Sequence, residues 1–178
     1  MRILGVDPGS RAAGWALVTF EGPPRLVAAG VLRPATDTPF AVRLLAIYDG
    51  LLAVIEREHP DEAAVERVFS GVNPQSLITL GEARGVLLLA LARASIPVHE
   101  VTPAEIKKTI TGTGQAGKEQ VRRMVLSLLG SPPGHSRLAL DAADAAAAAL
   151  THGYQTAAGR RASQPSAAFS TVKPRVGG

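Results

Sequence analysis

The chain has 178 residues, enough for one domain with a sizeable core, and it contains no cysteine, which excludes a disulfide framework and a thiolate metal site. Of its 19 basic residues four lie from Thr151 onward, where there are no acids, so residues 1–150 carry no net charge and the basic pI near 10.0 comes from the tail. We find neither a signal-peptide pattern nor an apolar run of membrane length. We therefore expect a soluble cytoplasmic protein that binds no membrane.

The first part of the chain predicts three strands, a helix and a fourth strand. Apolar runs bounded by Pro and Gly predict strands over residues 2–7, 14–20 and 25–32, and their short connections indicate an antiparallel meander. Apolar residues at helical spacing predict a long amphipathic helix over residues 40–58. A strand over 63–69 follows this helix, so we expect it to pair in parallel with the first strand.

The second part of the chain predicts four helices and one short strand. Helical patterns cover residues 75–95, a segment that begins at 103 with a capping-box sequence, residues 118–129 and an alanine-rich segment over 138–152. A short strand is expected over 98–101. The overall alternation predicts an α/β fold with a mixed five-stranded sheet flanked by helices.

The composition changes near the end of the predicted final helix. We expect one domain over residues 1–154. Residues 155–178 are basic and rich in Ala, Ser, Gly and Pro, which predicts a disordered tail.

Two carboxylates lie in predicted strands. Asp7 precedes a proline, which favours extended geometry, and a carboxylate at the carboxyl end of a buried strand lies where open α/β sheets place their ligands. The alternative is that Asp7 only forms a turn. Glu66 interrupts the apolar fourth strand, and the alternative there is a water-facing edge formed with Arg67. Strands one and four are natural neighbours in this order, which would bring Asp7 and Glu66 together.

Two further carboxylates lie in the final helix. Asp141 and Asp144 are three residues apart, so a helix places them on one face. They are the only charges in a long alanine-leucine run, and burial of unpaired charge is costly. Asp141 alone could serve as an N-cap, but Asp144 would then have no role. A metal site explains both residues.

Four carboxylates without cysteine or a histidine pair indicate a site for hard cations. Oxygen ligands favour Mg²⁺ or Mn²⁺ over Zn²⁺. Two Mg²⁺ ions about 4 Å apart would clamp the attacking and leaving oxygens of a phosphodiester, one by lowering the pKa of a water and the other by stabilising the departing 3′ oxygen. The residues therefore predict metal-dependent phosphodiester hydrolysis.

The chain resembles the RuvC-type Holliday junction resolvases, a family with the ribonuclease H-like fold. The resemblance implies that Asp7, Glu66, Asp141 and Asp144 are the metal-binding catalytic residues. In some members the position of Asp141 is a histidine, and Glu82 stands where the family usually has glutamine. The matching motifs run in order along the chain: Gly5-Val-Asp-Pro-Gly-Ser-Arg11 with Gly14, Val65-Glu-Arg-Val-Phe69, Leu80-Gly-Glu-Ala-Arg-Gly85, Ile106-Lys-Lys108 with Gly112, Lys118, and Asp141-Ala-Ala-Asp-Ala145 followed by Thr151-His152.

The resemblance also implies how such an enzyme works. Members act as homodimers on four-way junction DNA in homologous recombination and repair. They make paired symmetric nicks that leave 5′-phosphate and 3′-hydroxyl ends, use two Mg²⁺ ions per active site with Mn²⁺ able to substitute, and associate with a branch-migration complex. Helix 75–95 is the expected dimer interface. A core helix would show the same apolar stripe, which consists of Leu77, Leu80, Val86, Leu87 and Leu91.

Several residues are candidates for DNA contact. Phe69 directly follows the fourth strand and is expected to stack on an unpaired base, although a core phenylalanine would look the same in sequence. Lys107, Lys108 and Lys118 bracket a Gly-rich loop and are expected to bind phosphates, the alternative being a solvated face. Further candidates are Asn73, Arg84 and Arg11.

Three other functions fit parts of the pattern. An actin-like or sugar-kinase-like ATPase also has a Gly-x-Asp-x-Gly-Ser loop, as at residues 5–10, but needs two duplicated halves, and the chain has no second copy. Another ribonuclease H-like nuclease would use the same carboxylates on a different nucleic acid. A non-catalytic junction-binding protein gains nothing from four acids that face phosphates.

Overall fold

The computed structural model describes residues 1–67, 73–130 and 138–163, with side chains to residue 156, and in this part the chain forms a five-stranded sheet and five helices. Most element boundaries lie close to the predicted ones, and four elements agree with the prediction at both ends. The strands are β1 (Arg2–Asp7), β2 (Ala13–Thr19), β3 (Arg25–Leu32), β4 (Glu62–Glu66) and β5 (Val98–Val101). The helices are α1 (Phe40–Glu58), α2 (Pro74–Arg93), α3 (Pro103–Thr111), α4 (Lys118–Leu128) and α5 (Leu140–Ser163).

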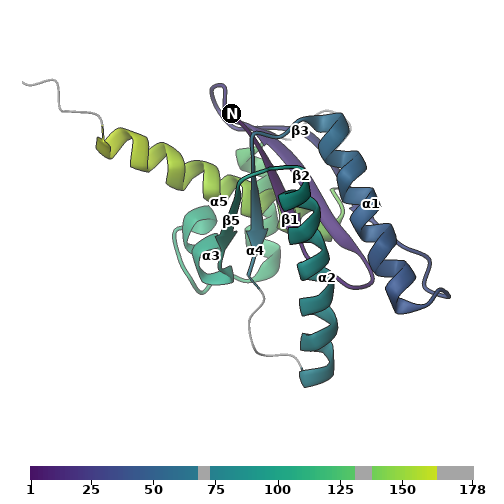
Figure 1. Ribbon diagram of the computed structural model, residues 1–178. Helices are drawn as coiled ribbons and strands as arrows, with labels where there is room; N and C mark the ends of the chain where they lie inside the picture. The colour runs from purple at the N-terminus through teal and green to yellow at the C-terminus, as the bar shows by residue number, and fades with distance from the viewer. Residues whose placement is uncertain (68–72, 131–137, 164–178) are drawn as a thin grey trace, which may run out of the picture.

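The sheet is mixed, with strand order β3-β2-β1-β4-β5 (Figure 1). Strands β1, β2 and β3 form the expected antiparallel meander, and β4 pairs in parallel with β1 and with β5. The prediction that the fourth strand lies parallel beside the first is confirmed. The carboxyl ends of β1, β4 and β5 therefore meet at one edge of the sheet.

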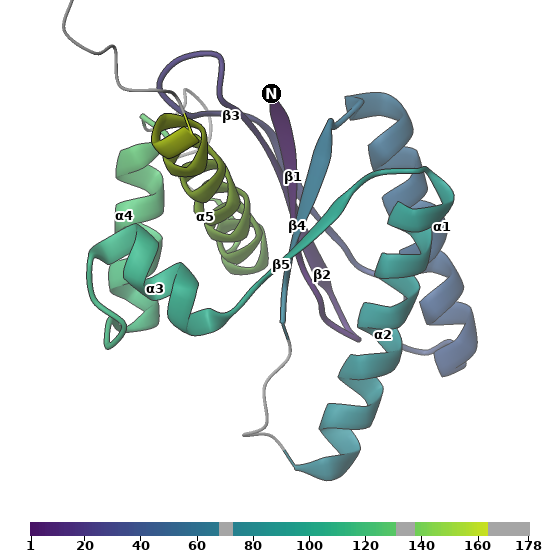
Figure 2. The same ribbon diagram turned by 60° about the vertical axis from the view of Figure 1, so that its left-hand side comes forward.

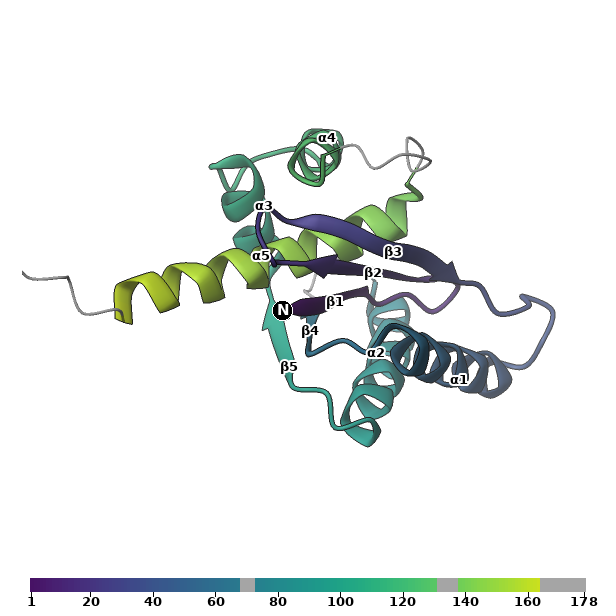
Figure 3. The ribbon, with the colours of Figure 1, turned by 90° about the horizontal axis from the view of Figure 1, so that it is seen from above.

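Helices cover both faces of this sheet. Figure 2 shows α1 and α2 on one face and α3, α4 and α5 on the other, and Figure 3 shows α5 lying across the sheet. Strand side chains alternate between the two layers. In β1, Leu4 and Val6 belong to the core beside α1 and α2, whereas Ile3 belongs to the core beside α5. The same alternation directs Asp7 toward α5.

Two glycines allow α5 to lie directly on the strands. A Cβ atom at Gly5 would lie 1.8 Å from the carbonyl oxygen of Ala145, and one at Gly14 would lie 2.0 Å from the carbonyl oxygen of Asp141. No side chain fits at these positions without moving the helix backbone. The alanines on the facing side of α5 permit the same close approach, so small residues on both elements set the height of α5 above β1 and β2.

We expect Gly5→Val to lower the free energy of unfolding by about 3 kcal/mol, because the new side chain would collide with helix backbone that cannot rotate away. Urea denaturation followed by circular dichroism measures this change. Gly114→Ala is the matched control, since nothing lies within 4 Å of a Cβ at this exposed loop position and its φ is outside the left-handed region. Equal stabilities of Gly5→Val and the parent chain would contradict the close contact.

Two element ends differ most from the sequence prediction. Helix α5 continues to Ser163, whereas the sequence predicted its end at His152. Alanine, glutamine and arginine favour helix strongly enough to carry it through Gly153 and Gly159. Strand β4 ends at Glu66, three residues before its predicted end. The predicted tail beyond Ser163 lies outside the described residues, and the domain boundary at residue 154 stays a prediction.

Helix α2 corrects one expectation about apolar segments. By length and composition it could cross a membrane: its most apolar 18-residue stretch has a mean hydropathy of 1.3, and 22% of that stretch is buried within the protein. Glu82 and Arg84 interrupt its apolar sequence, and its buried side covers the sheet beside α1. Ile78 and Leu89 are exposed apolar residues on its other side. One helix of this kind is weak evidence for a membrane span.

Candidate active site

The first two carboxylates end neighbouring parallel strands. Val6 of β1 pairs with Val65 of β4, so the next residues, Asp7 and Glu66, stand side by side at the carboxyl edge. Glu66 follows Ala64, which belongs to the core beside α5, so alternation directs Glu66 to the same face as Asp7. The prediction that Asp7 and Glu66 lie side by side is confirmed.

The other two carboxylates lie in the first turns of α5. Gly14 pairs with Asp7 in the β1–β2 ladder, and the backbone of Asp141 lies directly against Gly14. One turn further along, the backbone of Ala145, next to Asp144, lies against Gly5. The glycine contacts therefore place the start of α5 over the end of β1. Four acids from β1, β4 and α5 meet above one edge of the sheet.

Burial and mutual repulsion raise the pKa values of this group. Burial, followed by the charges of Glu66, Asp144 and Asp141, raises the pKa of Asp7 from 3.8 to about 8. Burial and then Asp144 raise the pKa of Glu66, and burial is also the main cause of the raised pKa of Asp144. The nearby ammonium of Lys118 offsets part of this rise in the pKa of all three acids. The acids are close enough to repel one another electrostatically, and a bound cation would relieve this repulsion.

These pKa values predict how stability depends on pH in metal-free buffer. Because the folded-state pKa of Asp7 lies above its unfolded value of 3.8, its contribution to stability is fully present below pH 3.8 and disappears as the pH rises through about 8. Asp7→Asn removes the free-energy cost of ionising this buried carboxyl group at high pH. We expect the variant to unfold about 4 °C or more above the parent chain at pH 8, and at about the same temperature as the parent at pH 4.

Thermal scans in the presence of a chelator test this expectation. Asp37→Asn, at an exposed position outside the cluster, is the control and should leave the difference between pH 4 and pH 8 unchanged. An Asp7→Asn midpoint at pH 8 equal to or below that of the parent chain would show that Asp7 is not buried among like charges.

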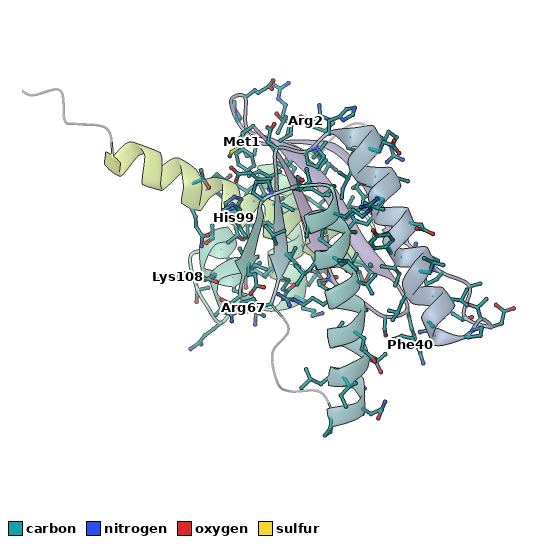
Figure 4. All side chains as sticks on the ribbon, viewed as in Figure 1. Met1, Arg2, Phe40, Arg67, His99 and Lys108 are labelled. Carbon is teal, nitrogen blue, oxygen red and sulfur yellow. The ribbon has the colours of Figure 1, made fainter. Side chains whose placement is uncertain are left out.

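The predicted basic residues lie on α3, at the start of α4 and in the turn after β1. Lys118, the first residue of α4, is exposed and is the basic residue whose charge reaches three of the acids. Lys107 is half-buried and Lys108 exposed on α3, and Arg11 is exposed in the turn after β1. Figure 4 shows Lys108 and Arg67 toward the carboxyl end of β4. The roles of these residues in DNA binding stay predictions.

Three other predicted contact residues have a structural partner or lie outside the described residues. The Asn73 side chain accepts a hydrogen bond of 2.8 Å from the Ser76 amide and so caps α2. Arg84 donates a short hydrogen bond to Glu100, so it is engaged within the protein. Phe69 lies outside the described residues, and its stacking role stays a prediction.

Two arginines near the site were missed by the sequence reasoning. Arg33 Nη2 lies 3.9 Å from Asp141 Oδ2, and Arg67 Nε lies 3.2 Å from Glu100 Oε2. Arg33 follows β3 directly, and β3 ends beside the start of β2, which is the end of the sheet where β1 finishes. The predicted antiparallel meander therefore already implied that Arg33 lies near the end of β1. Arg67 directly follows Glu66, and the sequence indicated for it only a place beside Glu66 on a water-facing edge.

The donor set fits a divalent hard cation. Four carboxylates offer oxygen ligands, and no cysteine competes in this chain. Asp7, Glu66 and Asp144 are partly buried with raised pKa values, so bound cations would relieve their repulsion. Asp141 is more open, and its partner Arg33 is exposed, which leaves the site accessible from solvent.

A sequence model of one family, described as crossover junction endodeoxyribonuclease RuvC, matches residues 3–152. The chain belongs to the RuvC family. The matched range contains all four carboxylates. The family resemblance that the sequence motifs indicated is therefore confirmed. The ribonuclease H-like prediction is confirmed as well, because solved RuvC structures share this arrangement of sheet and helices.

Curated relatives of this RuvC-family chain carry the same description. The protein from Anaeromyxobacter dehalogenans is 51% identical over 153 residues, which cover 85% of this chain and 80% of the relative. The protein from Chloroflexus aurantiacus is 47% identical over 157 residues, covering 86% of this chain and 93% of the relative. Both are named crossover junction endodeoxyribonuclease RuvC.

Solved structures extend the similarity to three dimensions. Thermus thermophilus RuvC, 32% identical, superimposes with a TM-score of 0.81 and covers 89% of this chain and 97% of its own. The same protein in complex with Holliday junction substrate gives a TM-score of 0.82, with 89% and 96% coverage. The yeast mitochondrial resolvase Ydc2, at 13% identity and a TM-score of 0.57 over 90% of this chain and 84% of its own, shares the fold.

Proposed function

We propose that this chain is a metal-dependent crossover junction endodeoxyribonuclease that resolves Holliday junctions by hydrolysing phosphodiester bonds. The observation that carries the proposal is the convergence of Asp7, Glu66, Asp141 and Asp144 at one edge of the sheet in a member of the RuvC family. A relative that superimposes over nearly the whole described chain is in complex with Holliday junction substrate, which supports the same substrate here.

We propose Mg²⁺ as the metal, two ions per site, with Mn²⁺ able to substitute. When bound, the ions supply charge stabilisation for the reacting oxygens and lower the pKa of a water molecule. Asp7 and Glu66 would hold them from the sheet, and Asp141 and Asp144 would hold them from α5. The close contact of α5 with Gly5 and Gly14 fixes the spacing between the two pairs of ligands. The rigid elements preorganise the site.

Lys118 is placed to bind the DNA backbone beside these ligands. It is exposed at the start of α4, and its charge reaches Asp7, Glu66 and Asp144. An ammonium there attracts the phosphate that must approach four acids, and the amides at the start of a helix also favour an anion. Lys107 and Lys108 on α3 extend this basic surface along the backbone.

We also propose that the chain acts as a homodimer through α2. Its exposed face carries Ile78 and Leu89, with exposed fractions of 57% and 60%, and between them Gly85 presents no side chain. These three residues lie on one line along the helix, because 7 and 11 residues are close to whole numbers of turns. A small residue between apolar ones lets two helices approach closely.

The stripe named from the sequence as the interface lies mainly elsewhere on α2. Leu87 and Leu91 are fully buried in the core, and Leu77, Leu80 and Val86 are half-buried. The proposed interface therefore uses the opposite side of the helix. Association with a branch-migration complex extends the proposal on the family resemblance alone, and the cytoplasmic location expected from the sequence stays a prediction.

Cleavage of a synthetic mobile four-way junction tests the function. The full chain is incubated with Mg²⁺ or Mn²⁺ and the junction, and in parallel with linear duplex DNA and an RNA–DNA hybrid. We expect paired symmetric nicks in the junction alone, with ends that ligase can seal. Cleavage of the linear duplex or the hybrid at a similar rate would assign the site to another ribonuclease H-like nuclease. Tight junction binding without cleavage under either cation would overturn the catalytic role.

A further inference from the structure

A second cluster of titratable side chains lies at the other end of β4. Glu62 begins the strand that Glu66 ends, and both follow the alternation that directs Ala64 toward α5. At about 3.3 Å per residue the two glutamates are about 13 Å apart along the strand. His99 of β5, labelled in Figure 4, and His152 of α5 meet Glu62 there.

Two imidazole nitrogens approach one carboxylate oxygen in this cluster. His152 Nε2 lies 2.5 Å from Glu62 Oε2, and His99 Nε2 lies 3.5 Å from the same oxygen. The two rings are stacked, with centroids 3.9 Å apart and planes inclined by 18°. One potential ligand atom from each of the three side chains lies within 4.8 Å of the other two.

We propose that Glu62, His99 and His152 bind a transition-metal ion of the Zn²⁺ class, at a site separate from the four carboxylates. Zn²⁺ binds imidazole nitrogen and carboxylate oxygen at about 2.0–2.2 Å, so ligand atoms in tetrahedral coordination stand about 3.3–3.5 Å apart. The separation of His99 from Glu62 already has this value. The ion replaces the hydrogen bond between His152 and Glu62, which lengthens by about 1 Å through rotation of the glutamate side chain.

The burial of the three side chains suits a bound ion. The His152 side chain is 7% exposed and Glu62 25%, whereas His99 is 46% exposed. The protein therefore holds His152 and Glu62 in place. The exposed His99 ring turns out of its stack on His152 to direct a nitrogen lone pair at an ion that enters from this side, and a water completes the coordination. Imidazole favours Zn²⁺ over Mg²⁺, while an all-carboxylate site favours Mg²⁺, so the two sites select different ions.

The location of this site gives the ion a structural role. Its ligands come from β4, β5 and α5, and the first and last of these also carry the catalytic acids Glu66, Asp141 and Asp144. A bound ion would fasten α5 to the sheet two to three helical turns beyond these acids. Because the ligands come from distant parts of the chain, the ion binds the folded state and stabilises it.

Cobalt spectroscopy on the full, untagged chain tests the proposal. Co²⁺ is titrated in the presence of millimolar Mg²⁺, which occupies the carboxylates, and Zn²⁺ is then added as a competitor. We expect one equivalent of Co²⁺ with the visible absorption of a tetrahedral site, displaced by Zn²⁺, and a higher unfolding temperature with Zn²⁺ bound. Absence of this absorption in the parent chain would overturn the proposal.

Variants assign the ligands. His99→Phe keeps the stacked ring and removes the nitrogen, and Glu62→Gln keeps a hydrogen-bonding group and removes the charge. We expect each to weaken Zn²⁺ binding by about 100-fold, since loss of even a second-layer partner costs about 10–100-fold. His59→Asn is the control, because His59 is exposed at φ 46° and asparagine tolerates that conformation. Unchanged affinity in folded His99→Phe would place the ion elsewhere.

Discussion

Asp7→Asn is expected to lower the rate of junction cleavage by about 1,000-fold or more, a loss of about 4 kcal/mol of transition-state stabilisation. Asparagine keeps the shape of Asp7 but supplies a neutral ligand where the proposed mechanism needs an anionic one. The variant should remain folded, because the ionised carboxylate is costly at this buried position and its pKa is raised to about 8. Junction affinity should stay the same or rise, since a neutral amide replaces an ionisable carboxyl group that faces phosphate.

Single-turnover cleavage and a gel-shift assay without divalent cations measure the two quantities separately. Asp49→Asn, an exposed change of the same chemistry on α1, is the matched control and should cleave at the parent rate. If Asp7→Asn cut junctions within a few-fold of the parent rate, the four acids would not be the catalytic centre. If it lost junction binding together with cleavage, the change would report on DNA affinity and not on catalysis.

Ile78→Glu combined with Leu89→Glu is expected to convert the proposed homodimer into a monomer. Two pairs of like charges would face each other across the twofold axis in place of two exposed apolar side chains. Each monomer keeps an intact cluster of carboxylates, since α2 contributes none of them. We therefore expect slow, unpaired single nicks in junction DNA instead of paired symmetric ones.

Sedimentation velocity gives the oligomeric state, and a cruciform plasmid assay distinguishes paired from single nicks. Val42→Glu combined with Leu45→Glu is the matched control, because these residues are exposed apolar positions on α1. The control should remain dimeric and cut in pairs. A dimeric Ile78→Glu, Leu89→Glu variant with paired cleavage would show that the exposed face of α2 is not the interface.

Local signals explain how much of the fold was predictable. The range of α1 follows from helical spacing of apolar residues, and α3 begins as predicted with a capping box in which Thr102 and Glu105 satisfy each other's backbone amides. The order of strands and helices also predicted that β4 lies in parallel beside β1. These features depend on neighbours in the sequence and on general rules of chain connection, so they need no knowledge of distant contacts.

Local propensity did not settle the end of α5 or the orientation of α2. The sequence beyond His152 has the composition of a tail, yet its alanines and arginines continue the helix to Ser163. On α2, apolar residues occur on both sides of the helix, and only packing against the core distinguishes buried Leu87 from exposed Leu89. Hydrophobic pattern alone does not distinguish a core from an interface.

The sequence by itself determined the identities of the four acids, the order of the elements that carry them and the family to which the chain belongs. Only the tertiary structure decided how close α5 comes to β1, through backbone contacts at Gly5 and Gly14. It also brought Glu62 to His152, 90 residues away in the chain. Such contacts depend on strand register and helix packing, which form when distant segments meet and leave no local pattern in the sequence.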